Sequence, residues 1–375
     1  MKYVKIAVFF AFILLFCLTF TPKLSAEEPS EEYSNFFGSL PDEIKDALPE
    51  NVNGGDPEAD AKKITSWDFL LSALGGGVSD GFRRIIPTFC ALLGLILISS
   101  VIGTVKTSLE PKTANILGLC SSSAIAVAFV SLQIGTVRAV AEYLADLLTL
   151  VNSMTPVVVL LYASGGNVAG ASVSSVAMSV FMGFCENILG KTVIPFSGIC
   201  LCLITVTTVT PEVGLDRLIT LIKNTYTKTV TFLMSVFCAI LAAQTAIAAG
   251  SDSISLRAVK FFTGSTIPVV GGSVNESMRM LAGSIGLLKK SFGITAIIII
   301  ALLTLPVIVM LLLSRFALNL AASAADLLHC PTERKLLDGI SGVYGMLIAV
   351  VTACSLMFVF LLTLFTLSAT ALSGT

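Results

Sequence analysis

The stretch TPVVVLLYASGGNV occupies residues 155–168, and a shortened counterpart, IPVVGGSV, occupies residues 267–274. In each, proline starts a run of apolar residues that leads into a glycine pair, a small polar residue and valine. The second copy lacks six residues between its valines and its glycines. Two copies of one pattern in one chain indicate an internal duplication.

The composition is that of a membrane protein. Of the 375 residues, 55% are hydrophobic and 13% are charged, and the mean hydropathy is +0.92. Soluble domains carry about 25% charged residues, so we predict an all-α, polytopic helical membrane protein. The formal net charge of −1 gives no reason to expect nucleic acid as a partner.

The N-terminus has the pattern of a secretory signal. Two lysines precede an apolar run, and a small residue stands at a suitable cleavage position. We therefore expect residues 1–26 to be a signal peptide, with an uncleaved first helix as the alternative. In both cases the chain from Glu27 onward is expected outside the cytoplasm.

Residues 27–84 are predicted to form a short acidic extracytoplasmic segment. Between residues 27 and 63, eleven acidic residues stand against three lysines. Phe36, Phe37 and Leu40 have helical spacing. This pattern suits either a short helix that docks on a partner or a solvated spacer.

Nine apolar runs follow this segment. A helix needs about twenty apolar residues to cross the hydrocarbon of a bilayer, and six of the runs meet this requirement. The other three contain or adjoin charged side chains. The first two runs are expected to form two transmembrane helices within residues 85–136. The runs are 85–105, 114–135, 145–163, 168–189, 192–210, 229–250, 266–288, 292–314 and 340–367.

The runs after residue 136 repeat in the same order in two halves. Pro156 and Pro268 are 112 residues apart, and Pro195 and Pro306 are 111 residues apart. This regular offset predicts a tandem duplication. The predicted segments are membrane repeat 1 at 137–250, membrane repeat 2 at 251–367 and a C-terminal tail at 368–375.

Each repeat carries a glycine pair between apolar helices, Gly165-Gly166 in the first and Gly271-Gly272 in the second. This pattern predicts re-entrant hairpins, whose free backbone groups must be buried in protein or line water. The alternative is two full spans joined by a glycine turn. Gly166 and Gly170 also begin a small-residue face that lets helices pack closely, within one chain or between the subunits of a homo-oligomer.

Five charged residues stand in or beside the interrupted runs. Three share one helix face at a spacing of four, and the other two are three residues apart and can pair. In a permease such residues would line the path of an ion or solute. In the other interpretation they lie on interfacial helices and meet headgroups and water. They are Arg138, Glu142, Asp146, Glu276 and Arg279.

The sequence gives little sign of catalysis. It contains one histidine, His329, and no HExxH, GxxxxGK[ST] or GxSxG motif. Metal sites normally combine several histidine, cysteine or carboxylate ligands. We therefore expect no enzymatic activity, no catalytic or metal-binding residues and no cofactor.

Charge does not fix the orientation of the membrane region. With the N-terminus outside, residues 211–228 and 315–338 are expected in the cytoplasm. The positive-inside rule should test this arrangement, but lysine and arginine are almost equally divided between the two sides.

One segment resembles a known family. SDSISLRAVKFFTGSTIPVVGG, residues 251–272, together with YASGGNVAGAS, residues 162–172, is similar to the stage III sporulation protein AE family of endospore-forming bacteria. The resemblance covers essentially the whole chain. It implies a membrane subunit of a secretion-like channel complex between mother cell and forespore. The expected location is the mother-cell membrane around the forespore, and the expected role is support of forespore development and late forespore gene expression.

The resemblance also implies partners. These are the other stage III sporulation A-operon proteins, including the AA ATPase and the ring proteins AF, AG and AH, and indirectly stage II sporulation protein Q. It brings no catalytic residues to this chain. The alternative function is a permease-like transporter with its own solute path through the two glycine hairpins.

Overall fold

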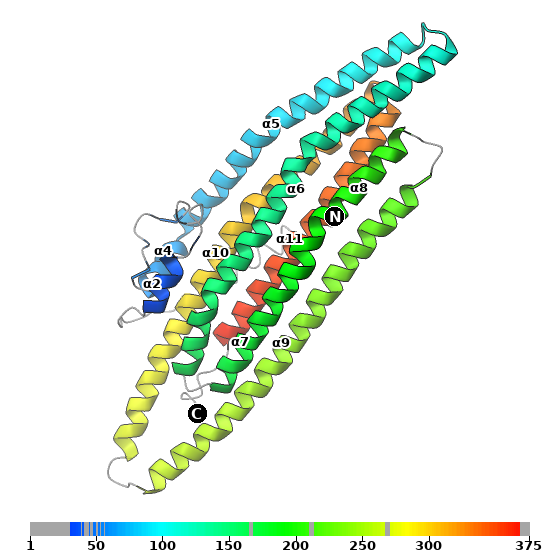
Figure 1. Ribbon diagram of the computed structural model, residues 1–375. Helices are drawn as coiled ribbons and strands as arrows, with labels where there is room; N and C mark the ends of the chain where they lie inside the picture. The colour runs from blue at the N-terminus through cyan, green and yellow to red at the C-terminus, as the bar shows by residue number, and fades with distance from the viewer. Residues whose placement is uncertain are drawn as a thin grey trace.

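The computed structural model describes residues 31–38, scattered positions between 40 and 55, and residues 57–164, 168–209, 214–266 and 271–367. These residues form helices and turns, with no strand among them. The chain begins with two short helices, α2 (Glu31–Gly38) and α4 (Pro57–Ile64). Long helices make up the rest of the described chain (Figure 1).

The long helices run back and forth along a narrow bundle. The helices after residue 66 are, in chain order, α5 (Trp67–Lys106), α6 (Pro111–Ser164), α7 (Val168–Phe184), a π-helical turn (Cys185–Gly190), α8 (Lys191–Val209), α9 (Asp216–Thr266), α10 (Gly271–Leu327) and α11 (Pro331–Leu367). The connections α5–α6, α8–α9 and α10–α11 lie toward one end, which we call the upper end (Figure 1). The junctions α6–α7 and α9–α10 lie toward the opposite, lower end.

Six helical segments of the described chain are long and apolar enough to cross a membrane. This finding confirms the prediction of an all-α, multi-pass membrane protein. The segments are longer than a bilayer requires: α6 has 54 residues, which corresponds to about 81 Å at 1.5 Å per residue. The hydrocarbon core of a bilayer is about 30 Å thick.

The structure joins apolar runs that the sequence suggests are separate. Runs 114–135 and 145–163 are parts of α6, and residues 271–288 and run 292–314 are parts of α10. The charged residues between the runs do not end the helices, because Arg, Glu and Lys are good helix formers. The nine apolar runs therefore do not correspond to nine separate helices.

The order of elements is the same in the two predicted repeats. The predicted boundary at 136/137 falls inside α6, and the boundary at 250/251 falls inside α9. From each boundary the chain runs to the lower end, returns in one long proline-containing helical segment, and descends again (Figure 1). The duplication itself stays a prediction.

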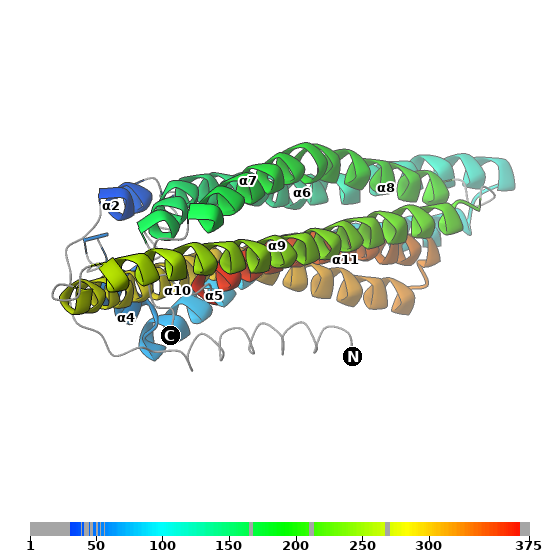
Figure 2. The ribbon, with the colours of Figure 1, turned by 90° about the horizontal axis from the view of Figure 1, so that it is seen from below.

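Both glycine pairs belong to junctions between long helices. Gly165 and Gly166 lie outside the described residues, in the connection from α6 to α7, and Gly271 and Gly272 are the first residues of α10. The helices that meet at each junction continue far along the bundle (Figure 2). The re-entrant hairpin and the glycine turn both stay predictions.

The acidic N-terminal segment packs against its own bundle. Phe36 of α2 is 1% exposed, and its ring centroid lies 5.4 Å from that of Phe292 in α10. Phe37, Leu40 and Leu48 are also buried. The sequence suggests either a docking helix or a solvated spacer for these apolar residues. In the structure they pack within the chain itself.

Candidate functional site

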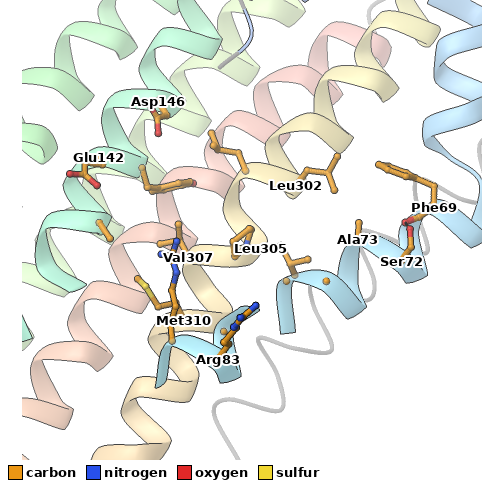
Figure 3. Close-up of a pocket in the computed structure, with 18 residues that line it drawn as sticks. Phe69, Ser72, Ala73, Arg83, Glu142, Asp146, Leu302, Leu305, Val307 and Met310 are labelled. Atoms are coloured by element: carbon orange, nitrogen blue, oxygen red, sulfur yellow. Dashed lines mark hydrogen bonds between the residues drawn. The ribbon is translucent and has the colours of Figure 1, made fainter. Parts of the chain in front are cut away.

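A pocket of about 820 Å³ opens between α5, α6 and α10 (Figure 3). Apolar residues of α10 line one side of it, including Leu302, Leu305 and Met310. Pro306 also lines the pocket. Its counterpart in the first predicted repeat is Pro195. The site therefore lies where the first membrane helix meets the second repeat.

The two other walls of the pocket carry opposite charges. Helix α5 contributes Arg83 and Arg84, and α6 contributes Glu142 and Asp146. Both arginines and Glu142 are exposed, while Asp146 is half-buried. Figure 3 shows the two carboxylates on α6, apart from Arg83 on α5. The pocket thus offers separate basic and acidic groups above an apolar floor.

Small residues let α5 approach α10 closely beside the pocket. A Cβ atom added to Gly81 would lie 2.9 Å from Leu313 Cδ1 and 3.1 Å from Val309 Cγ1. A Cβ atom added to Gly77 would lie 3.8 Å from Leu305 Cδ2. The glycine-rich start of α5 therefore has a packing role in this part of the site.

A buried hydroxyl cluster adjoins the pocket. Tyr143, which also lines the pocket, places its hydroxyl 2.6 Å from Ser355 Oγ and 3.1 Å from Thr304 Oγ1. Thr304 Oγ1 donates its hydrogen to the carbonyl of Ile300, and it lies 3.2 Å from Ser355 Oγ. Buried polar groups are costly unless they are paired, so this cluster fixes how α6, α10 and α11 face one another.

The predicted polar stripe on α6 is only partly at the pocket. Glu142 and Asp146 line it, whereas Arg138 is exposed on the same helix without lining it. Glu276 and Arg279 belong to the first part of α10, where side chains lie outside the described residues. The same holds for the surroundings of Gly170, Gly271 and Gly272.

Sequence reasoning missed the residues that face the acidic stripe. Arg83 and Arg84 closely follow the Gly75–Gly77 triplet. A glycine-rich helical turn followed by two arginines is the sequence pattern that could have indicated them. Tyr143 was missed because nothing in its local sequence indicates the partners of its hydroxyl. Only the fold brings Thr304 and Ser355, far along the chain, to its hydroxyl.

These features define a class of protein: a multi-pass helical membrane protein with a lateral pocket of mixed charge. A family model described as stage III sporulation protein AE matches residues 56–369. The chain therefore belongs to the stage III sporulation protein AE family, as the resemblance predicted.

Stage III sporulation protein AE from Bacillus subtilis (strain 168) is 26% identical to this chain over 337 residues. The aligned region covers 88% of this chain and 81% of that protein. No solved structure matches this chain. The membership supports a role in sporulation.

Proposed function

We propose that the protein is a membrane subunit of a secretion-like channel complex that links mother cell and forespore. Its proposed location is the mother-cell membrane around the forespore, and its proposed role is structural and not enzymatic. The observation that carries the proposal is the family match over residues 56–369, in a chain with six helices long enough to cross a membrane. Loss of such a subunit would stop forespore development and late forespore gene expression.

The surface of α5 and α6 supports a scaffold role. Five apolar side chains near the upper end of these helices are each at least 53% exposed. Exposed apolar side chains of this kind suit contact with lipid or with other membrane subunits, including the other stage III sporulation A-operon proteins. The residues are Leu97, Ile98, Val101, Ile116 and Leu119.

Disruption of the gene in its host tests the proposal. The expected result is collapse of the forespore and loss of late forespore transcription, with recovery when the wild-type gene is supplied in trans. The tagged protein should also co-purify with the AA ATPase or with the AF, AG and AH proteins from sporulating cells. A normal spore yield after disruption would remove the sporulation role.

The charged pocket favours a second candidate function, a permease with its own solute path. Leucines in place of Gly165-Gly166 and Gly271-Gly272 test the two functions against each other, and Glu142→Gln tests the pocket directly. If partners still co-purify but passage of small molecules stops, the permease is favoured. If co-purification is lost, the scaffold is favoured.

A further inference from the structure

The pocket between α5, α6 and α10 has charged walls whose charges do not pair with each other. Arg83, Arg84 and Glu142 line it, and all three are exposed. None of them has an ion pair or a side-chain hydrogen bond with another residue that the structure describes. Met310 of α10 lies between Glu142 and Arg83 in the view of Figure 3. The pocket therefore presents a cationic wall and an anionic wall, one on each side of an apolar floor.

These charges lie at one end of a pair of apolar helix segments. Arg83 and Arg84 directly precede the apolar run 85–105 of α5, and Glu142 follows the run 114–135 of α6. Helices α5 and α6 are joined at the upper end (Figure 1), so both runs extend from the pocket toward that end. Each run is long enough to cross the hydrocarbon of a bilayer, which takes about twenty residues. The ends of membrane helices lie at the level of the lipid headgroups, so the charges of the pocket are within reach of a headgroup.

The size and the floor of the pocket suit an amphiphile better than a small free solute. Its volume of about 820 Å³ is near the upper limit of the roughly 300–1,000 Å³ found for pockets that enclose drug-sized ligands. Leu302 and Leu305 are part of the floor. On α5, Phe82 and Ile86 stand within two residues of the arginines and are 49% and 57% exposed. A ligand with its headgroup between the charged walls can therefore lay hydrocarbon chains on adjoining apolar side chains.

Glycines of α5 leave this space open. Gly76 lines the pocket, and a Cβ atom added there would meet no atom within 4 Å. Its neighbour Gly75 also has open space at the Cβ position, but it does not line the pocket. The two positions allow a matched comparison, because the same larger side chain enters the pocket from only one of them.

We propose that this pocket binds the headgroup of a zwitterionic aminophospholipid of the phosphatidylethanolamine class. Arg83 and Arg84 bind the phosphate, because the planar guanidinium group donates to two phosphate oxygens at once. The Glu142 carboxylate accepts hydrogen bonds from the primary ammonium group of the lipid. The quaternary ammonium group of phosphatidylcholine has no hydrogen to donate. Such binding is compatible with a scaffold and with a permease, so it is tested apart from both proposed functions.

The test uses the full-length protein in detergent micelles, titrated with phosphatidylethanolamine, phosphatidylcholine, phosphatidylglycerol or water-soluble phosphoethanolamine. Bound lipid is measured by native mass spectrometry, and the shift in melting temperature is recorded in parallel. Phosphatidylethanolamine should bind to the wild type more tightly than the other two lipids. Arg83→Gln and Arg84→Gln should each weaken this binding by about fivefold, the effect of one basic side chain on contact with a lipid headgroup. Glu142→Gln should weaken it by a similar factor.

Two comparisons separate binding from folding. Gly76→Leu should fill the pocket and abolish binding of phosphatidylethanolamine, whereas Gly75→Leu should leave it unchanged. Arg138→Gln removes an exposed arginine of α6 that does not line the pocket. This variant is the control for the charge changes and should bind as the wild type does.

Reversal of one wall tests the arrangement of charges directly. Glu142→Lys replaces the carboxylate by a further basic side chain. The preference should then pass from phosphatidylethanolamine to phosphatidylglycerol, whose headgroup has a phosphate and no amine. A gain of phosphatidylglycerol binding cannot result from loss of folding.

Three results would overturn the proposal. The first is equal phosphatidylethanolamine binding by the wild type and by the three glutamine variants of the pocket. The second is equal binding of phosphatidylethanolamine and phosphatidylcholine by the wild type. The third is full reproduction of the effect by phosphoethanolamine, which would show a site for a free zwitterionic solute. All three are independent of spore yield, which tests the proposed role in sporulation.

Discussion

Phe36 in the acidic N-terminal segment packs edge-on against Phe292 in α10, at an interplanar angle of 73°. Phe292 in turn packs against Phe365 of α11, with ring centroids 6.2 Å apart. Aromatic pairs of this geometry contribute about 0.5–1.5 kcal/mol beyond the area they bury. The segment before the membrane helices is therefore attached to the bundle by a chain of rings.

Phe36→Ala should weaken the attachment of the N-terminal segment to the helical bundle. Loss of a buried phenylalanine lowers the free energy needed to open the contact locally, and cleavage from the open form then becomes faster. We expect tryptic cleavage after Lys45 to accelerate by about tenfold. Phe82→Ala, which removes a ring that is 49% exposed, is the matched control. Equal cleavage rates in the two variants would contradict the attachment.

Gly81→Val should force α5 away from α10. The new side chain would meet Leu313 and Val309, and overpacking of this kind costs about 1–3 kcal/mol. The melting temperature of the purified protein should fall. Gly75→Val places the same side chain on the same helix where nothing lies within 4 Å, so its effect should be limited to helix propensity. A larger loss at Gly75 would show that α5 does not pack as described.

Tyr143→Phe should destabilise the protein by about 1 kcal/mol, because one hydroxyl leaves a cluster that can partly rearrange. Thr304 and Ser355 remain hydrogen-bonded to each other in this variant. Unfolding in detergent with increasing denaturant measures the change. Tyr226→Phe, which removes a hydroxyl that lies 2.9 Å from Thr192 Oγ1, should cost less. The opposite order would rule out a shared role for the three hydroxyls.

The arrangement of helix ends predicts the result of cysteine labelling from outside. In a background without native cysteines, Lys45→Cys should react with an impermeant thiol reagent. Thr332→Cys and Thr113→Cys, both at the upper end (Figure 1), should be protected. Labelling of Thr332→Cys but not of Thr113→Cys would show that the two upper connections lie on opposite sides of the membrane.

Cys330, in the turn between α10 and α11, should react slowly and with a marked pH dependence. Burial raises the pKa of its thiol, and the nearby Glu333 carboxylate acts in the same direction. Since the thiolate is the reactive form, a raised pKa lowers the reactive fraction at pH 7, and the rate should climb as pH increases. Leu327→Cys, at a position that is 80% exposed, should react faster at pH 7. Equal rates would contradict the burial of Cys330.

The class of fold could be predicted because it depends on composition and on run length. Apolar runs of about twenty residues have few alternatives to a membrane helix. The ends of these helices could not be predicted from the same signal. Arg138 and Glu142 interrupt an apolar run without interrupting the hydrogen bonds of α6, so hydropathy alone divides one helix into two.

Only some of the residues that line the pocket could be predicted from the sequence. Glu142 and Asp146 are noticeable because charged residues are rare in this chain. Arg83 and Arg84 on α5 belong to a segment that the sequence assigns to the polar region before the membrane. The contact between α5 and α10 joins residues more than two hundred positions apart. No local pattern carries that information.

Helix α6 is too long to lie entirely within a bilayer. Membrane helices tilt by at most about 40°, and at that angle 30 Å of hydrocarbon takes up about 39 Å of helix. The 54 residues of α6 therefore leave about 42 Å of helix outside the hydrocarbon, counted over both sides of the membrane. A neighbouring protein that binds the end of α6 is therefore held at a fixed distance from the bilayer.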